Sequence, residues 1–582
     1  MKIINKETKE KLQKFFFEEK ASAIFFAITS IIIMLIASFC LYTAKIRVSV
    51  CDWPLWLALT LSSGGMAIAS VFASWVLDSR WEANTLSKML GAITAFCLLT
   101  LLVGTIGTSP LFQAQNLHDE VAPYVQKMDK SAFPNLLGKN NDPSNLPLYG
   151  EAEALKKAET EMGKYPALGS QFQLDKDELT SQNFNGKLVY VIPLEPIDMF
   201  KWNSEKGAPG FFIIDRNNGN VVFVDKPFFT TTAAPWGDNV RRIANNYLCK
   251  NGISGLTTDP SPEVDNENNL HFVTTVYEKK GFLGGYKKIL GVVDTNAHTK
   301  ESKFYPFEEV PEWIDRVVPE EFFLNYLGDY GSYGHGFWNS VFAKSGVQMM
   351  TSDSFTTNME STSRDGEKKN TTSQTYDVIY IDGTCFYYTG WTSAGKEGAT
   401  NGIMMMNSRT GDIQYYSTYG ISEGKSQSVV EGLVSDKGYQ ATYPLLLQVA
   451  GEETYFHLMR DENQNLVGYA FCNYKDYQKA GFGTSINDAE AAYIKALGKT
   501  SSSEEFDTKE LSTVEGSIKA LSTEVLDGNT IYYIKVDGVP DIFSAYSKVN
   551  IDLVFAKVGD KIKIEYYKSK DAVQAIKNCD IN

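Results

Sequence analysis

The sequence predicts an α+β protein with a three-helix transmembrane anchor, duplicated modules of antiparallel sheet and helix, and a C-terminal small β-barrel. Three observations support this. Three long runs without a charged residue lie within the first 112 residues. Two hairpin patterns with the same punctuation occur at 210–225 and 402–417. Residues 513–582 then alternate apolar and polar side chains around short turns, which is typical of small closed barrels.

The charge-free runs are residues 21–42, 53–77 and 89–112, and each can cross a hydrocarbon core of about 30 Å as a helix. A signal peptide followed by core helices is excluded, because the first run is too long and no small-residue cleavage site follows it. On the second run, Gly65, Ala69 and Ala73 recur every four residues, a spacing that permits close helix packing in the membrane. A transport path shared with a partner is the alternative to a plain anchor.

Basic residues orient this anchor. The N-terminal segment 1–20 holds six lysines, and Arg80 and Lys88 lie between the second and third runs. Only Lys45 and Arg47 lie between the first two runs. The positive-inside rule therefore places residues 1–20 in the cytoplasm and everything after the third run outside. We expect a multi-pass protein of the plasma membrane with a large extracytoplasmic C-terminal domain.

The net charge of the chain is −15, and it is unevenly divided: residues 1–107 carry ten basic and seven acidic side chains, a net +3, so residues 108–582 carry −18. The ectodomain is therefore acidic, which excludes a general nucleic-acid binder because phosphates would be repelled. The expected partners are the lipid bilayer and an envelope protein or cell-wall glycan, and the sequence leaves open whether the chain forms a homo-oligomer. Seven cysteines are too sparse for a disulfide scaffold, and we expect free buried thiols, with one or two disulfides in the ectodomain as the alternative.

After the anchor, residues 113–185 are expected to form a helical connector. Within it, GEAEALKKAETEM (150–162) has the pattern of an exposed helix with a Glu153–Lys157 pair. Residues 186–335 and 336–498 then read as two copies of one α+β unit. A polar stretch at 352–375 is expected to be a mobile loop, and 499–512 a linker.

The two copies have corresponding residues in their hairpin turns. Asp215 and Gly219 of the first hairpin correspond to Asn407 and Gly411 of the second. The glycine supplies a positive φ, and the Asp or Asn side chain can bond the turn backbone. In the last domain, a turn at 557–561 precedes alternating Ile562, Ile564 and Tyr566, and this domain resembles an OB-fold or SH3-like barrel.

The hairpin pattern, at Phe211 to Val224 and Ile403 to Tyr416, is an apolar run, Asp or Asn, polar residues, Gly and a second apolar run. It resembles the PepSY domain and its YpmB-like relatives, and NSRTG (407–411) comes near their [DT]xxTG motif. With EEVPEWIDRVVPEE and GHGFWNS, the chain also resembles large multi-pass membrane proteins of Gram-positive bacteria. The resemblance implies an envelope-facing binding or scaffolding role and carries no catalytic residues.

No enzyme motif stands out. The five histidines are scattered, and neither a metal-ligand spacing nor a phosphate-binding loop occurs, so we expect no catalytic residues, no metal and no cofactor. The strongest catalytic candidate is an acidic set that could act on a sugar. The alternative is a helical pattern through Trp313, Val317, Phe323 and Leu327, with the acids and Arg316 on its wet face. The acidic set comprises Glu312, Asp315, Glu320, Glu321 and Asp329, with His335 beside it.

The stretch YLGDYGSYGHGFWNS (326–340) lies where the first copy ends. It is either an aromatic-packed junction or a pocket for a glycan or partner. The ligand- or partner-binding candidates are Trp313, Tyr330, Tyr333, His335, Phe337 and Trp338. We favour a membrane-anchored, non-enzymatic binding or scaffold protein of a bacterial cell envelope. The alternatives are a subunit of a membrane transport or secretion complex and a cell-wall-polymer hydrolase.

Overall fold

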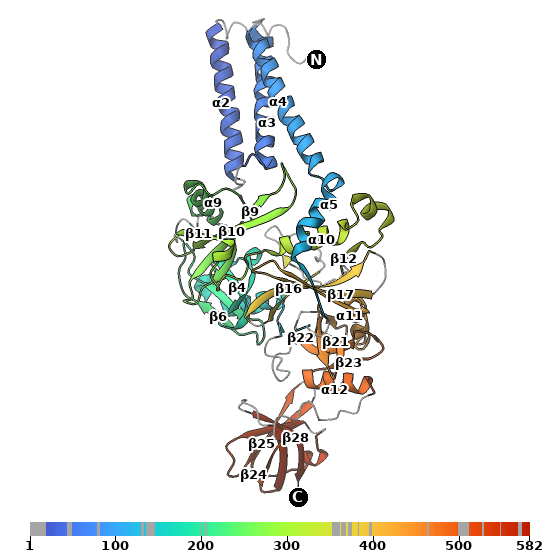
Figure 1. Ribbon diagram of the computed structural model, residues 1–582. Coiled ribbons are helices and arrows are strands. Elements are labelled where there is room, and N and C mark those ends of the chain that lie inside the picture. Colours follow the sequence, from blue (N-terminus) through green and yellow to red (C-terminus); the bar gives the residue numbers. More distant parts are fainter. Residues whose placement is uncertain are drawn as a thin grey trace. The chain divides into compact units, whose positions relative to one another are not determined.

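The computed structural model is shown in Figure 1. It describes residues 19–43, 49–77, 82–129, 133–134, 146–198, 201–202, 204, 207–351, 361–362, 368–369, 375–381, 383–394, 399–462, 465–498, 511–526, 529–546, 549–567 and 573–581. The expected N-terminal segment 1–18, nearly all of the loop at 352–375 and most of the linker at 499–512 lie outside the described residues. The chain forms two compact units, Met1–Tyr493 and Ile494–Asn582.

Long apolar helices open the first unit, as predicted. They are α2 (Glu19–Thr43), α3 (Trp53–Leu77) and α4 (Glu82–Gly107). Two spans, Trp53–Phe72 and Ser87–Gly107, are long and apolar enough to cross a membrane, and α2 contributes the shorter apolar stretch Phe26–Cys40. A Cβ on Gly65 would lie 3.4 Å from Ile33 of α2, so this glycine faces a neighbouring helix. The side chain of Ala73 lies outside the described residues.

The end of α4 is joined to the globular part in two ways. The chain continues through α5 (Pro110–Val121), which contacts α10 (Glu320–Tyr333), into β1 (Val125–Met128). In addition, the tip of the hairpin formed by β9 (Leu270–Lys279) and β10 (Lys287–Asn296) reaches the start of α3 and the end of α4 (Figure 1). There Lys279 pairs with Asp52 at 2.7 Å, and the Leu283 N–H donates to the Cys51 carbonyl at 3.2 Å.

Besides a two-stranded sheet of β13 (Ser361–Thr362) and β14 (Lys368–Lys369), four larger sheets follow, and their strand orders match in pairs. The first sheet has the order β2-β4-β5-β6 with β3 on β4, and the third has the order β12-β16-β17-β18 with β15 on β16. Strand β1 adds to the third sheet in parallel with β18. The strands of the first sheet are β2 (Phe172–Leu174), β3 (Thr180–Phe184), β4 (Lys187–Pro196), β5 (Phe211–Asp215) and β6 (Val221–Val224). Those of the third are β12 (Gln348–Met350), β15 (Asp377–Ile381), β16 (Thr384–Ser393), β17 (Ala399–Asn407) and β18 (Ile413–Ile421).

The second and fourth sheets share another order, β7-β9-β10-β11 with β8 on β9, and β19-β21-β22-β23 with β20 on β21. A helix precedes each, α9 (Val240–Lys250) and α11 (Glu423–Gly432). The remaining strands of the second sheet are β7 (Leu256–Thr257), β8 (Ser261–Val264) and β11 (Ser302–Pro306). Those of the fourth are β19 (Gln440–Ala441), β20 (Leu445–Val449), β21 (Glu452–Arg460), β22 (Leu466–Asn473) and β23 (Ala480–Gly483), followed by α12 (Ile486–Ala496).

The hairpin turns have the predicted chemistry. Gly219 and Gly411 adopt φ values of +68° and +74°. The Asp215 carboxylate accepts the Asn217 N–H at 2.8 Å, and the Asn407 side-chain oxygen accepts the Arg409 N–H at the same distance. Each turn is thus closed by the side chain that begins it.

The segment 113–185 differs from the expected helical connector. Besides α5, α6 (Glu151–Met162) and α7 (Pro166–Gly169), it supplies β1 to the third sheet and β2 and β3 to the first. Helix α6 is not fully exposed either, because Ala154 and Ala158 are buried in the core beneath the first sheet. The predicted Glu153–Lys157 pair is wrong, since Glu153 pairs with Arg460 of β21.

The second unit contains a closed barrel of five strands in the order β24-β25-β26-β28-β27. Strand β24 also pairs with β27, and β26 runs parallel to β28. Ile562, Ile564 and Tyr566 are buried in the barrel core, as the alternating pattern predicted. The strands are β24 (Leu511–Leu526), β25 (Asn529–Val536), β26 (Ile542–Tyr546), β27 (Lys561–Tyr567) and β28 (Val573–Ile581), with a short helix at Ile551–Val554. All seven cysteines of the chain are free; Cys385, Cys472 and Cys579 are buried, as expected, whereas Cys249 is exposed.

Candidate functional site

A large cavity lies inside the first unit. Its volume is about 1660 Å³, and its lining comes from α6, the first sheet, the segment before α10, and the third and fourth sheets. Ordinary small-molecule sites span roughly 300–1,000 Å³, so this cavity, called the chamber from here on, has room for a larger ligand. Its wall combines charged and hydroxyl groups with apolar and aromatic side chains.

Every basic side chain of the chamber wall is paired with a carboxylate of the same wall. Eleven acidic and five basic residues line the chamber. The five pairs are Lys176–Glu159 (2.6 Å), Arg216–Asp377 (3.2 Å), Arg241–Asp259 (2.6 Å), Arg316–Glu320 (2.7 Å) and Arg460–Glu153. The wall cations are therefore already neutralised, and the remaining charge of the chamber is negative.

Arg216 shows how the pairs hold the wall together. It follows β5 in the first hairpin turn and is almost fully buried. Its guanidinium donates to the Ser181 hydroxyl and the Val378 carbonyl, both at 3.1 Å, and lies 4.5 Å from the centre of the Tyr190 ring. Arg216 thus connects the first sheet to β15 of the third.

Four wall carboxyls, Glu151, Asp177, Glu178 and Asp315, form no ion pair within the described part of the chain. Burial raises the pKa of Glu178 to about 7, although a hydrogen bond to Thr232 acts in the opposite direction. Burial also raises the pKa of Glu151. Arg241 and Arg316 lower the pKa of Glu178, and Arg216 lowers that of Glu151, but burial has the larger effect on both carboxyls.

Asp315 is positioned by a second buried carboxyl, Glu263. The Glu263 oxygens accept the backbone N–H groups of Asp315 (2.7 Å) and Arg316 (3.1 Å), while Asp315 accepts the Asn183 N–H at 2.5 Å. Burial raises the pKa of both carboxyls, and Asp315 raises that of Glu263 further. The expectation that Asp315 lies on the wet face of a helix is wrong, because only 2% of it is exposed and the helix begins at Glu320.

The acidic set considered for catalysis does not form one site. Arg316 donates two hydrogen bonds of 2.8 and 2.7 Å to Glu320, so its charge is paired with this member of the set. Asp315 belongs to the chamber wall, whereas burial raises the pKa of Asp329, farther along α10, to about 6. Glu321 and His335 are exposed. The members of the acidic set therefore lie in different surroundings, with only Asp315 and Glu320 on the chamber wall.

The six residues proposed for ligand or partner binding also lie in separate parts of the first unit. Trp313 lies against the ring of His271, with 4.7 Å between centroids, in the second module. Tyr330 stacks on His118 of α5 at 5.2 Å, and Tyr333 packs on the same core as α5 and α10. After Gly334, Phe337 and Trp338 begin a short exposed turn in which Trp338 stacks on Phe342 at 5.7 Å. The described contacts do not join Trp313 to the other five, and none of the six lines the chamber.

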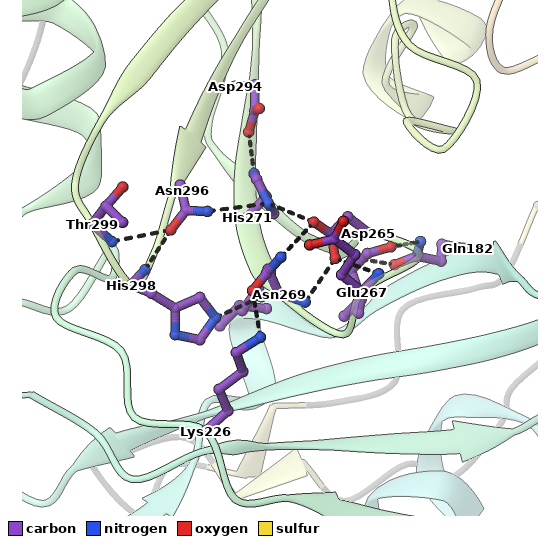
Figure 2. Close-up of polar contacts among 12 residues, drawn as sticks. Gln182, Lys226, Asp265, Glu267, Asn269, His271, Asp294, Asn296, His298 and Thr299 are labelled. Carbon is purple, nitrogen blue, oxygen red and sulfur yellow. Dashed lines mark hydrogen bonds and ion pairs between the residues drawn. The ribbon is translucent and has the colours of Figure 1, made fainter.

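A second polar cluster surrounds His271 (Figure 2). Its Nδ1 lies 2.7 Å from Asp294, and its Nε2 lies 3.4 Å from Asp265. The nearby His298 accepts the Leu270 N–H at Nε2 and donates from Nδ1 to the Pro227 carbonyl. Both nitrogens of each ring are therefore occupied. We call this cluster the histidine brace, because it ties the β9–β10 hairpin to the segment after β6.

No group of three or more His, Cys, Asp or Glu residues in the described part of the chain is arranged to hold a metal ion.

Sequence reasoning missed the chamber because its pairs connect distant segments. A signal was present, however: Arg216 directly follows the apolar strand FFIID, and Arg460 ends the strand pattern ETYFHLMR. Arginine is rarely buried without a partner, so an arginine adjoining a buried strand predicts a carboxylate on another element.

No family model matches the chain. No curated protein is similar to it either. Among solved structures, a levansucrase in complex with sucrose aligns with 80% of this chain and 93% of its own at 8% identity, with a TM-score of 0.17. A levansucrase of B. subtilis aligns with 78% of this chain and 95% of its own, also at 8% identity, with a TM-score of 0.18. Scores this low carry no argument about fold or function.

Proposed function

We propose that this chain is a membrane-anchored, non-enzymatic binding protein of a bacterial cell envelope, and that the chamber is its ligand site. The chamber is the observation that carries the proposal. The chamber is open to solvent, and its volume of about 1660 Å³ exceeds the roughly 300–1,000 Å³ of ordinary small-molecule sites, so it is the default candidate for a ligand site. Charged side chains on its wall support this role.

The proposal includes a three-helix anchor with the N-terminus in the cytoplasm and the sheets outside. Two long apolar helices and the lysines of segment 1–20 support it. It also includes PepSY-like modules and an OB-like barrel. The shared order of the sheets supports the first, and the closed barrel with β26 parallel to β28 supports the second.

The orientation is tested with the exposed thiol of Cys249. A membrane-impermeant maleimide added to intact cells should label a full-length Cys51→Ser variant, and the further change Cys249→Ser should remove most of that label. Labelling that appears only after the cells are opened would contradict the extracytoplasmic placement.

The ligand site is tested by filling the chamber. Ala233 is on its wall with an exposed side chain, and no hydrogen bond depends on that methyl group. We would measure the thermal midpoint of full-length protein in detergent with three probes: chitotetraose, a tetralysine peptide and a tetraglutamate peptide. At least one probe should raise the midpoint, and Ala233→Trp should abolish the increase. Ala491→Trp, on the exposed side of α12, is the matched control. If no probe acts on the unaltered protein, the proposal fails.

A further inference from the structure

The charge of the chamber wall restricts what can enter it. An anionic ligand needs basic groups, and all five on the wall already have carboxylate partners. Using Arg216 or Arg460 would break a pair and leave a largely buried carboxylate without its cation, which is costly, whereas the partners of Lys176 and Arg241 are exposed to solvent. Phosphates, nucleotides and acidic polymers are therefore poor ligands for this site.

The unpaired carboxyls favour the opposite charge. Glu151 begins α6, Asp177 and Glu178 lie in the short helix after β2, and Asp315 precedes α10. They belong to three separate elements of one wall, so a ligand that meets all of them has to carry several positive groups spaced apart. A bound cation would stabilise the ionised forms of Glu151, Glu178 and Asp315, whose pKa values burial raises despite the arginines nearby.

The remainder of the wall suits the body of such a ligand. Apolar side chains that can cover methylene groups alternate with the carboxyls, among them Met162, Phe172, Leu324 and Phe456. Tyrosine rings attract cations through their faces, and the chamber already contains one example, Arg216 over Tyr190. Tyr376 and Tyr443 also line the wall and add further rings.

We infer that the chamber binds an organic polycation, with ammonium groups at Glu151, Glu178 and Asp315 and its aliphatic part against the apolar wall. This inference rests on the proposed function. A short basic peptide and a polyamine share this chemistry. The volume of about 1660 Å³ exceeds that of an ordinary small-molecule pocket and matches the peptide better.

The experiment is isothermal titration calorimetry on full-length protein in neutral detergent. The probes are tetralysine, spermine, tetraserine, tetraglutamate and chitotetraose. We expect saturable binding of tetralysine, with spermine binding more weakly, and no binding of tetraglutamate. The variant Glu151→Gln/Glu178→Gln keeps the side-chain shapes and removes two charges, and it should weaken tetralysine binding at least tenfold. Spermine binding that is tighter than tetralysine binding would identify the polyamine as the source.

A charge-matched control separates the chamber from the acidic surface. Glu301 and Glu462 are exposed and lie outside the chamber, so Glu301→Gln/Glu462→Gln should leave binding unchanged. If Glu151→Gln/Glu178→Gln and Glu301→Gln/Glu462→Gln bind tetralysine equally, the peptide attaches to the acidic surface and not to the chamber. That result would overturn the inference. Binding of tetraserine or chitotetraose that Ala233→Trp abolishes, without binding of either polycation, would overturn the inference and leave the proposed function standing. If no probe binds at all, both fail.

Discussion

The chamber and the histidine brace are both polar regions inside the same unit, and they are built in opposite ways. In the brace, polar groups meet each other, and both ring nitrogens of His271 and of His298 have protein partners. In the chamber, five ion pairs are complete, but carboxyls such as Glu151 and Glu178 face open space. A buried group that its neighbours satisfy stabilises the fold, whereas one that faces a cavity costs stability and is available to a ligand.

The largest effect should come from breaking a complete pair of the chamber. Arg216→Met leaves Asp377 buried without its cation and removes the link between the first and third sheets. Loss of one partner of a buried pair typically costs about 3–5 kcal/mol of unfolding free energy. Urea unfolding of full-length protein in detergent would measure it, and Arg216→Met/Asp377→Asn should recover part of the loss. A single variant as stable as the unaltered protein would show that this pair does not hold the wall.

A smaller loss is expected in the brace. Asp294→Ala removes the acceptor 2.7 Å from the His271 Nδ1 and leaves a buried donor unsatisfied. The expected cost is about 1–3 kcal/mol in the same unfolding experiment. Tetralysine affinity should not change, because the brace lies outside the chamber. A variant that loses affinity while remaining folded would contradict the division between the two regions.

Glu178→Gln should stabilise the protein at alkaline pH, whereas the two preceding changes destabilise it. Because burial raises the pKa of Glu178 to about 7, from an ordinary value of 4.5, the folded chain holds this proton more tightly than the unfolded chain. Its contribution to stability is therefore lost as the pH rises from about 4.5 through about 7. The variant should be modestly more stable than the unaltered protein at pH 8 and no more stable at pH 4, while it binds tetralysine more weakly. Equal stability at pH 8 would show that Glu178 carries no desolvation cost.

The smallest effect is the pH dependence of binding. Glu178 has to ionise before it can meet an ammonium group, so tetralysine affinity should rise a fewfold between pH 6 and pH 8. Arg241, Arg316 and Asp259 act on this carboxyl electrostatically, and Thr232 donates to it. Calorimetry at several pH values would follow the change, and Glu178→Gln should flatten it. An affinity that falls over this range would place the polycation elsewhere.

The features that the sequence predicted correctly depend on contacts between residues close together in the chain. The apolar helices and the Asp215 and Asn407 turns depend on residues close in the chain, and they appear where expected. The helix expected from Trp313 onward failed because Glu263, far away in sequence, binds the N–H groups of Asp315 and Arg316. The chamber depends entirely on such contacts: the Arg460–Glu153 bond joins residues separated by 307 positions. Its location could not be seen without the fold.

The pairing of β1 with β18 has a consequence for synthesis. Val125 lies beside Ile413, so about 290 residues must be translated after β1 before its partner exists. At ordinary elongation rates this takes on the order of tens of seconds. Before this time has passed, all strands of the first and second sheets have been translated. The backbone groups of β1, at the end of α5, still lack the strand with which they pair. The nascent chain therefore passes through a stage in which its early modules are complete and one β-strand is unpaired. An unpaired strand edge can pair with other chains, so we expect a chaperone to have its largest effect at this stage.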